Sequence, residues 1–352
     1  MLKVGLIGLG SVAERIHLPA IATVTEISLV AACDPDTSRQ NLMKTRFQIP
    51  QVYADAETLL AKERPDLVII GTPPQLHKDL CLLALDKGAH VFCEKPFVNS
   101  LAQADEIIEK ADKAARLVAV NNQYRYMNMY RIPQEQMARG DFGQPFLIQC
   151  WQQMFHPPYK EKNWRADLVQ STLFEFGTHA FDLLCFFFGA FPLSISVQTP
   201  RSRPDIAADV VVVGTLRFPN EAMATIVFNR ISHATERYFE MRVDCHEASL
   251  RISLGGVAKA SLDWSRVLGR PIVRYGLVKG GLAVLEKGGY SKVIASERQS
   301  AFASATAANL RGFVNKIQAG EKDNISVRQA RELIRLVFAG YESAQKGEAI
   351  WL

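Results

Sequence analysis

Short apolar runs alternate with longer amphipathic stretches along the first third of the chain. The runs cover residues 2–8, 27–34, 66–71, 90–93 and 117–120. Their unbroken apolarity is typical of strands that are buried on both faces. Between the later runs, residues 75–87 and 101–115 repeat apolar positions at spacings of three and four, which predicts crossover helices. This alternation predicts an α/β fold with a doubly wound parallel sheet.

Beyond residue 121 the pattern changes to β-like runs that are separated by turn residues. Residues 210–218 and 222–230 flank Pro219-Asn220-Glu221, which predicts a hairpin. Further β-like runs cover residues 146–153, 239–244 and 248–252. These runs predict a second domain of the α+β class, built on a largely antiparallel sheet.

The C-terminal part adds a glycine-rich stretch and two helical patterns. Residues 276–289 are rich in glycine and predict a mobile excursion, whereas residues 301–319 and 327–346 predict amphipathic helices. We therefore expect a dinucleotide-binding domain over residues 1–121. A substrate-binding and oligomerisation domain should follow over residues 122–352, with closing helices that are able to pack back toward the first domain.

Composition and charge narrow the class of protein. Apolar residues make up 48% of the 352 residues and charged residues 22%, the balance of a globular protein with large cores. The net charge of +5 is dispersed without a basic block, which argues against a nucleic-acid partner. The most apolar stretch, residues 181–193, is too short for a membrane span of about 20 residues.

Cysteine usage and the N-terminus indicate a cytoplasmic protein. No pair of cysteines has CxxC spacing, and most lie in apolar runs, so they are interpreted as reduced core residues. They are Cys33, Cys81, Cys93, Cys150, Cys185 and Cys245. The first expected strand begins at Leu2, which leaves no room for a signal peptide ahead of it.

The first strand leads into a glycine turn that is typical of a dinucleotide site. The sequence reads Gly8-Leu9-Gly10-Ser11-Val12-Ala13 and continues into a helical pattern. Gly8 permits the tight turn, and Gly10 lets a pyrophosphate approach backbone amides at a helix N-terminus. A chance glycine-rich turn is the alternative, but the position in a βαβ unit favours the Rossmann fingerprint.

Asp34, at the end of the second run, predicts the choice of cofactor. Its position is about 20 residues past the glycine turn, where an acidic side chain accepts hydrogen bonds from the adenosine ribose. A carboxylate there would repel a 2′-phosphate, so we expect NAD rather than NADP, although Arg39 could partly offset the repulsion. The alternative role for Asp34 is a helix cap ahead of Pro35.

Several motifs resemble those of the Gfo/Idh/MocA family, the relatives of glucose-fructose oxidoreductase and inositol dehydrogenase. The most specific is Glu94-Lys95-Pro96, which follows the strand at residues 90–93. The resemblance spans nearly the whole chain. It also includes Thr72-Pro73-Pro74-Gln75-Leu76-His77, Tyr124-Arg125-Tyr126, the Gly140-Asp141-Phe142-Gly143 turn, Trp164-Arg165 and Gly177-Thr178-His179 with Asp182.

The resemblance implies roles for individual residues. Lys95 would lie near the nicotinamide and a substrate oxygen, and His179 matches the family's catalytic histidine. Further cofactor contacts are implied for Thr72, Pro73, His77, Glu94, Trp164 and Arg165. The chain departs from the family pattern at Glu175, where an Asp is usual, and at Val169-Gln170-Ser171, where a glycine triplet is frequent.

The chemistry of these residues agrees with hydride transfer. Oxidation of a secondary alcohol needs a base for the hydroxyl proton, a role that suits His179, while Lys95 would polarise the oxygen. Glu175 lies four residues before His179, so in a helix its carboxylate could orient or acidify the imidazole. The alternatives are a solvated Lys95, a core histidine at position 179 and a loop-capping role for His77.

Four further side chains are candidates for contacts with substrate hydroxyls: Arg125, Tyr126, His156 and Tyr159. No group of His, Cys, Asp or Glu has metal-ligand spacing, so we expect no metal. The leading hypothesis is an NAD-dependent oxidoreductase that acts on a sugar or polyol. The alternative is a cofactor-binding sensor without turnover. The open face of the 210–230 hairpin predicts a homodimer or homotetramer.

Overall fold

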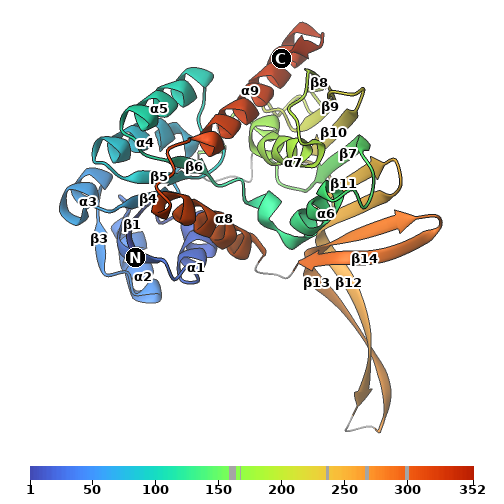
Figure 1. Cartoon of the computed structure of the whole chain (residues 1–352), viewed down its shortest axis with the longest axis horizontal. Helices are drawn as coiled ribbons and strands as arrows, with labels where there is room; N and C mark the ends of the chain where they lie inside the picture. The colour runs from blue at the N-terminus through green and yellow to red at the C-terminus, as the bar shows by residue number, and fades with distance from the viewer. Residues whose placement is uncertain (158–163, 167, 235–237, 266–268, 298–300) are drawn as a thin grey trace. The chain divides into compact units, whose positions relative to one another are not determined.

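The computed structural model describes the chain except for residues 158–163, 167, 235–237, 266–268 and 298–300. It divides into two compact units, and Figure 1 shows their elements. The first unit comprises Met1–Tyr126 and Phe302–Phe338, and the second comprises Met127–Ala301 and Ala339–Leu352. Most of the two closing helices thus groups with the N-terminal residues.

The first unit is built on a parallel sheet of six strands in the order β3-β2-β1-β4-β5-β6. The strands are β1 (Leu2–Ile7), β2 (Ile27–Cys33), β3 (Gln51–Tyr53), β4 (Leu67–Ile70), β5 (His90–Cys93) and β6 (Val118–Val120). The strand order reverses between β1 and β4, which makes their carboxyl ends the place where open α/β sheets bind ligands. The doubly wound parallel sheet expected from the sequence is confirmed.

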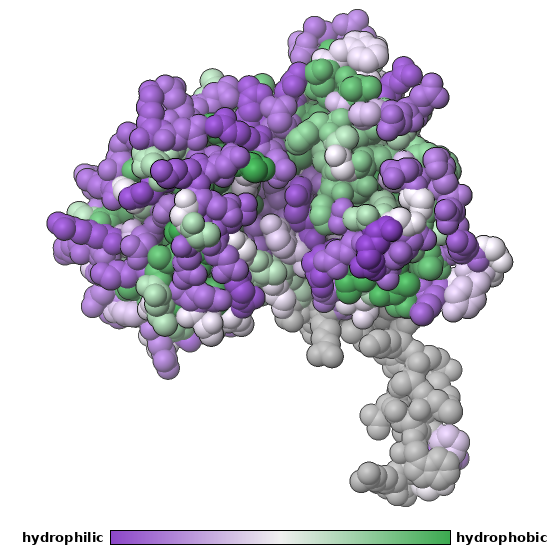
Figure 2. All heavy atoms as spheres, viewed as in Figure 1, coloured by the Kyte–Doolittle hydropathy of each residue, from purple (hydrophilic) through white to green (hydrophobic). Residues whose placement is uncertain are grey.

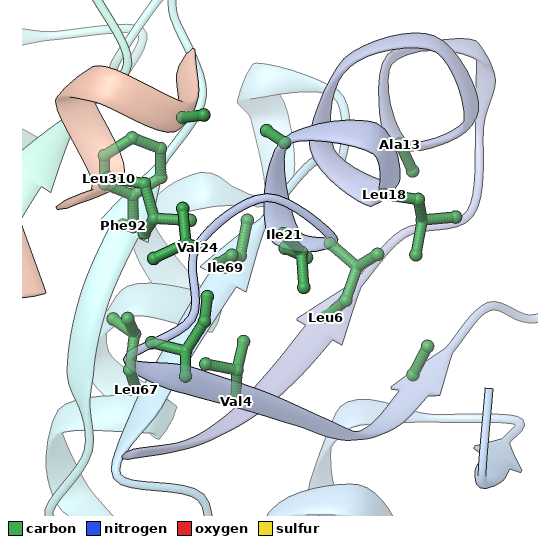
Figure 3. Close-up of a cluster of buried hydrophobic side chains, with 14 of the residues drawn as sticks. Val4, Leu6, Ala13, Leu18, Ile21, Val24, Leu67, Ile69, Phe92 and Leu310 are labelled. Carbon is green, nitrogen blue, oxygen red and sulfur yellow. The ribbon is translucent and has the colours of Figure 1, made fainter. Parts of the chain in front are cut away.

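Helices connect the strands of the first unit and cover the sheet. They are α1 (Leu18–Ile21), α2 (Thr37–Phe47), α3 (Ala56–Glu63), α4 (His77–Asp86), α5 (Leu101–Lys113) and α8 (Ala301–Gln318). Helix α9 (Ile325–Lys346) begins in the first unit and ends in the second. Figure 3 shows the core on one face of the sheet, where Leu310 of α8 lies in the same apolar cluster as Val4 and Leu6.

The second unit contains a sheet of nine strands in the order β14-β13-β12-β11-β7-β10-β9-β8-β15. All pairs are antiparallel except β7 with β10. The strands are β7 (Pro145–Gln153), β8 (Ser194–Gln198), β9 (Val211–Arg217), β10 (Met223–Asn229), β11 (Tyr238–Cys245), β12 (Ser249–Ser265), β13 (Arg270–Lys287), β14 (Tyr290–Glu297) and β15 (Ile350–Trp351). The largely antiparallel α+β unit is confirmed.

The hairpin of β9 and β10 turns where the sequence predicts it. Asn220 and Glu221 both adopt left-handed backbone conformations, with φ values of 59°, and close the connection. Most of residues 276–289, the glycine-rich stretch for which the sequence predicts a mobile excursion, lies in strand β13. Strand β13 pairs with β12 from Ser249↔Glu286 to Ser265↔Arg270. The two strands form the long ribbon in Figure 1.

Helices α6 (Asn128–Ala138) and α7 (Thr178–Phe188) belong to the second unit. In the face of the molecule shown in Figure 2, hydrophobic residues gather over α7 and strands β8 to β10, whereas the surface of the first unit is largely hydrophilic. Among the described residues, no helix combines the length and apolarity that a membrane crossing requires. All six cysteines are buried thiols without a disulfide, as the sequence predicts.

Candidate active site

The glycine turn after β1 requires glycine for two physical reasons. Gly8 has a φ of +92°, in the left-handed region that favours glycine. A Cβ atom at Gly8 would also lie 3.0 Å from the carbonyl carbon and oxygen of Gly71, so β1 and β4 approach each other closely here. The backbone N–H of Gly8 donates to the carbonyl of Cys33 at 2.9 Å. The turn is thus held by both neighbouring strands.

Asp34 braces this turn from the end of β2. Its Oδ2 accepts the backbone N–H of Leu9 at 2.7 Å, and its Oδ1 accepts that of Asp36 at 2.9 Å. The N-cap of α2 is Asp36, whose carboxylate accepts the N–H of Ser38 at 2.8 Å. The helix cap considered for Asp34 is therefore supplied by Asp36.

Arg39 lies against the same turn. Its Nη2 donates to the carbonyl of Leu9 at 2.6 Å and to Glu14 Oε2 at 3.0 Å. Arg46 binds the other oxygen of Glu14. These contacts lower the pKa of Glu14, with the hydrogen bond from Arg39 as the largest cause. Arg39 thus supports the turn in this structure.

The carboxyl edge of the first sheet fits a dinucleotide. Among the described residues, no heavy atom lies within 4 Å of where a Cβ would stand at Gly10, and Ser11 and Val12 begin the following helix. Of the buried side-chain polar atoms that lack a hydrogen-bond partner within the described residues, three belong to this edge: Thr72 Oγ1, Asn122 Oδ1 and Gln123 Oε1. All three follow β4 or β6 on this edge, and buried polar atoms are stable when a ligand completes their hydrogen bonds.

Lys95 is presented by a buried turn that follows β5 on the same edge. Glu94, Pro96, Phe97 and Val98 are all buried, whereas Lys95 is half-buried. The backbone N–H of Lys95 donates to the carboxylate of its neighbour Glu94 at 3.1 Å. The turn is therefore packed firmly around Lys95, whose side chain is itself half-buried.

His77 holds this turn rather than facing solvent. The side chain is fully buried, its Nδ1 lies 2.8 Å from the carbonyl oxygen of Phe97, and its Nε2 lies 2.8 Å from that of Thr72. Burial lowers the pKa of His77 despite these carbonyl contacts. The two interpretations of His77 were ligand contact and loop capping, and these contacts favour loop capping. Thr72 and Pro73 lie beside it, directly after β4.

The second cluster of candidates lies at the start of α7 in the second unit. A π-helical turn, Leu173–Gly177, precedes the helix and contains Glu175, and His179 follows in the first turn of α7. Both side chains are buried, with 6% and 3% of their residue surface exposed. The sequence predicted that Glu175 and His179 pair because they lie four residues apart in an α-helix. In the structure, part of this interval is a π-helical turn, which is wider than an α-helical turn.

Two arginines hold the Glu175 carboxylate. Arg165 Nε donates to Oε1 at 2.5 Å, and Arg230 Nη1 donates to Oε2 at 3.1 Å. Arg230 is only 1% exposed, binds Ser171 through the same nitrogen, and donates from Nε to the carbonyl of His156 at 3.2 Å. This group of residues, which we call the Glu175 cluster, joins the end of β7, the end of β10 and the start of α7.

Sequence reasoning missed Arg230, although a signal was present. Along β10 the buried positions Ala224, Ile226 and Phe228 alternate with more exposed ones, and Arg230 continues the buried phase two residues later. An arginine on the inward phase of a strand needs a buried partner. That alternation could therefore have indicated a carboxylate nearby.

The stretch that departs from the family's glycine triplet is anchored by Asp209. Its carboxylate accepts the backbone N–H groups of Thr172 and Leu173, each at 2.9 Å, and the hydroxyl of Tyr341 at 3.0 Å. Burial raises the pKa of Asp209, while these donors oppose the rise. Val169 and Gln170 line a cavity of about 320 Å³ together with Asp209 and Tyr341. Asp209 thus caps the turn that leads to Glu175 and His179.

The remaining candidates divide between the two units. Arg125 and Tyr126 lie in the 3-10 turn after β6, in the first unit, and both are half-buried. The guanidinium carbon of Arg165 lies 4.3 Å from the centre of the Trp164 ring, a cation–π contact in the second unit. Tyr159 lies outside the described residues. In the part of the chain that the structure describes, no group of three His, Cys, Asp or Glu could hold a metal ion.

Comparison with known proteins identifies the family. A family model described as an oxidoreductase family with an NAD-binding Rossmann fold matches residues 2–122, and that of the GFO/IDH/MocA C-terminal domain matches residues 130–251. Together these matches cover more than half of the chain. The chain belongs to the Gfo/Idh/MocA oxidoreductase family. The NAD-binding domain and the family resemblance are thereby confirmed.

The relatives include dehydrogenases of sugars. D-glucoside 3-dehydrogenase of Escherichia coli (strain K12) is 30% identical over 146 residues, which are 42% of each protein, so the match spans less than half of that enzyme. D-apiose dehydrogenase of Paraburkholderia graminis is 28% identical over 71% of this chain and 67% of its own length. An Agrobacterium radiobacter oxidoreductase crystallised with NAD+, L-tartaric acid and magnesium has a TM-score of 0.81 at 21% identity, covering 99% of this chain and 98% of that one, which shows a shared fold.

Proposed function

We propose that the chain transfers hydride between a nicotinamide cofactor and a secondary alcohol or ketone of a sugar or polyol. The observation that carries the proposal is the carboxyl edge of the first sheet. Gly8, Asp34, Thr72 and Lys95 follow four different parallel strands, and parallel strands bring their carboxyl ends to one edge. A dinucleotide turn and an accessible cation therefore share one site. The sugar dehydrogenases among the relatives support the substrate class.

The proposed chemistry divides between two side chains. The cofactor, when bound, accepts or donates the hydride. Lys95 would donate a hydrogen bond to the substrate oxygen and stabilise the negative charge that develops on it. The His179 imidazole would take the hydroxyl proton during oxidation and return it during reduction. The proposal therefore requires Lys95 and His179 to meet at one substrate oxygen.

Glu175 is proposed to position His179 rather than to exchange protons. Its two oxygens bind Arg165 and Arg230, so its negative charge is compensated within the Glu175 cluster. A carboxylate held in this way fixes the turn from which α7 begins. Arg125, Tyr126 and His156 are proposed as contacts for substrate hydroxyls, and Trp164 with Arg165 as contacts for the cofactor.

We further propose NAD as the preferred cofactor, because Asp34 follows β2, where an acidic side chain would meet the adenosine ribose, and Arg39 is engaged by Leu9 and Glu14. A cytoplasmic location is proposed as well, supported by the six buried free thiols. The sequence also predicts both the preference for NAD and the cytoplasmic location.

A homo-oligomer is proposed through the outer face of β7, β9 and β10. On this face Val213 and Val227 lie directly opposite each other and are 42% and 37% exposed. Trp151 of β7 lies opposite Val227 on the other side, and Met223, four residues before Val227 in β10, is 40% exposed. Contiguous apolar side chains across three strands are stabilised when another surface covers them. A second copy of the chain would supply that surface.

Steady-state assays with NAD+ and a panel of polyols and sugars test the function, with NADH binding measured separately. Lys95→Ala and His179→Ala should keep NADH affinity and lose about 10²–10⁴-fold in turnover. Lys95→Arg should not restore turnover, because a planar guanidinium cannot replace a compact ammonium at a crowded oxygen. The matched controls are Lys87→Ala and His246→Ala, which change exposed residues. NADH binding without turnover of any panel member would instead support a cofactor sensor.

A further inference from the structure

A chain of buried polar side chains lies beneath the turn that carries Lys95. Glu94 is 5% exposed; its Oε1 accepts the side-chain N–H of Asn121 at 2.7 Å and lies 2.9 Å from His17 Nε2. Asn121 also donates to Thr306 Oγ1 at 3.1 Å, and Asn309 donates to Asn121 at 3.3 Å. All five residues belong to the first unit and are buried. The proposed reaction assigns no role to these five buried side chains.

The charge at the centre of this chain is the Glu94 carboxylate. Burial raises the pKa of Glu94, but the contacts with His17, Asn121 and Lys95 outweigh burial, so the pKa lies below its ordinary value. A buried carboxylate is costly unless hydrogen bonds and opposite charges compensate it. The surroundings of Glu94 therefore favour an ionised side chain that is held in one position.

His17 reaches Glu94 from the helix that starts at the glycine turn. It is the last residue of a π-helical turn, Ala13–His17, and is 0% exposed. The Nε2–Oε1 distance is that of an ion pair, although the N–H direction does not meet hydrogen-bond geometry within the described residues. The ring packs edge-on against Phe92, and its Cδ2 lies 3.5 Å from the position of a Cβ at Gly71. Single π-turns occur frequently at functional sites.

His77 holds the other side of the same turn. Its Nδ1 lies 2.8 Å from the carbonyl oxygen of Phe97 and 3.1 Å from that of Pro96. One buried histidine therefore contacts the side chain that precedes Lys95, and the other contacts the backbone that follows it. Both histidines also lie beside the segment after β4: the His17 ring fills the space next to Gly71 that a Cβ would approach, and His77 Nε2 lies 2.8 Å from the carbonyl oxygen of Thr72. The Lys95 turn is thus fixed to the strand ends that form the dinucleotide site.

We propose that His17 is a positioning residue for Lys95, acting through the Glu94 carboxylate; this inference rests on the proposed role of Lys95 in hydride transfer. The contact joins the helix behind the glycine turn to the peptide that presents the Lys95 ammonium. The contact thereby keeps the Lys95 ammonium in a constant position relative to the bound cofactor. Loss of the contact moves the cation while the glycine turn keeps its own supports at Cys33 and Asp34.

The test compares two substitutions of His17. His17→Gln keeps an N–H donor that reaches toward Glu94, whereas His17→Leu keeps similar bulk without a donor. His17→Leu should lower kcat between about 10-fold and 100-fold, the cost of misplacing a reacting group by about 1 Å, with little change in the NADH dissociation constant. His17→Gln should recover most of that loss. The exposed His246→Gln serves as the matched control.

A double-mutant cycle tests the route through Glu94. On a Glu94→Gln background, His17→Leu should lower kcat far less than it does in the unmodified chain, because the two side chains act as one unit. Additive losses would overturn the inference. If His17→Leu does not fold, Glu94→Gln alone tests the inference, because this substitution keeps the shape of the Glu94 side chain and removes its negative charge. A kcat and NADH affinity like those of the unmodified chain would then contradict the positioning role.

Amide hydrogen exchange in the cofactor-free chain separates this inference from the proposed function. The Lys95 amide donates to Glu94, so its exchange should accelerate in His17→Leu and stay near that of the unmodified chain in His17→Gln. This readout needs no substrate and holds even if no panel member is turned over. Unchanged exchange together with unchanged kcat in His17→Leu would show that His17 only fills space.

Discussion

Arg230→Met is expected to destabilise the second unit strongly, because it leaves a buried carboxylate with one partner fewer. Arg230 is 1% exposed, and its guanidinium binds Glu175, Ser171 and the carbonyl of His156. Methionine keeps much of the apolar stem and removes the charge. Removing one member of a buried ion pair costs about 3–5 kcal/mol of unfolding free energy. Arg165 still binds one oxygen of Glu175, so we expect about 3 kcal/mol, the lower end of that range.

Urea unfolding followed by tryptophan fluorescence measures this loss. Glu175→Gln on the Arg230→Met background should recover more than half of the lost stability, because the uncompensated charge is then removed as well. Arg201→Met, at an exposed arginine, is the matched control and should leave the unfolding free energy nearly unchanged. The reasoning is refuted if Arg230→Met costs less than about 1 kcal/mol, or if the double variant loses the sum of the two single losses.

Three further predictions concern the cofactor, the pH dependence of stability and assembly. Asp34→Ser should raise the NADP-to-NAD efficiency ratio, with Arg39 turning to the 2′-phosphate; an unchanged ratio would place Asp34 away from the ribose. Burial, followed by the charge of Arg116, lowers the pKa of His90 to about 4, against about 6.5 in an unfolded chain. His90 therefore contributes stability above about pH 6.5 that is lost as the pH falls toward about 4, and His90→Gln should flatten this loss in urea unfolding between those pH values. Val227→Lys should lower the mass found by light scattering from that of an oligomer to that of a monomer, and a mass that does not change would exclude this face.

Much of the fold could be predicted because the patterns were local. Continuous apolar runs marked β1, β2, β4, β5 and β6, and turn residues marked the hairpin at Pro219-Asn220-Glu221. Strand β3 has only three residues and no apolar run, so nothing local distinguished it. Glycine content did not indicate that most of residues 276–289 form a strand, because backbone pairing with β12 overrides the low strand propensity of glycine.

The candidate site could be predicted only in part, for a related reason. Gly8 and Asp34 stand at fixed distances along one βαβ unit, so their joint role follows from sequence spacing. The partners of Glu175 come from positions 165 and 230, far apart in sequence, and no spacing rule connects them. Two π-helical turns, one that ends at His17 and one that precedes His179, depend on tertiary packing, which helical periodicity does not express.

Isotope transfer tests the central claim most directly. The chain is incubated with NAD+ and polyols or sugars that carry deuterium on the reacting carbons, and mass spectrometry follows deuterium in the nicotinamide. The account predicts deuterium in the reduced cofactor with at least one panel member, its loss in Lys95→Ala and His179→Ala, and retained NADH binding in both variants. Deuterium transfer that persists at the rate of the unmodified chain in His179→Ala would contradict the proposed chemistry, as would NADH binding without deuterium transfer from any panel member.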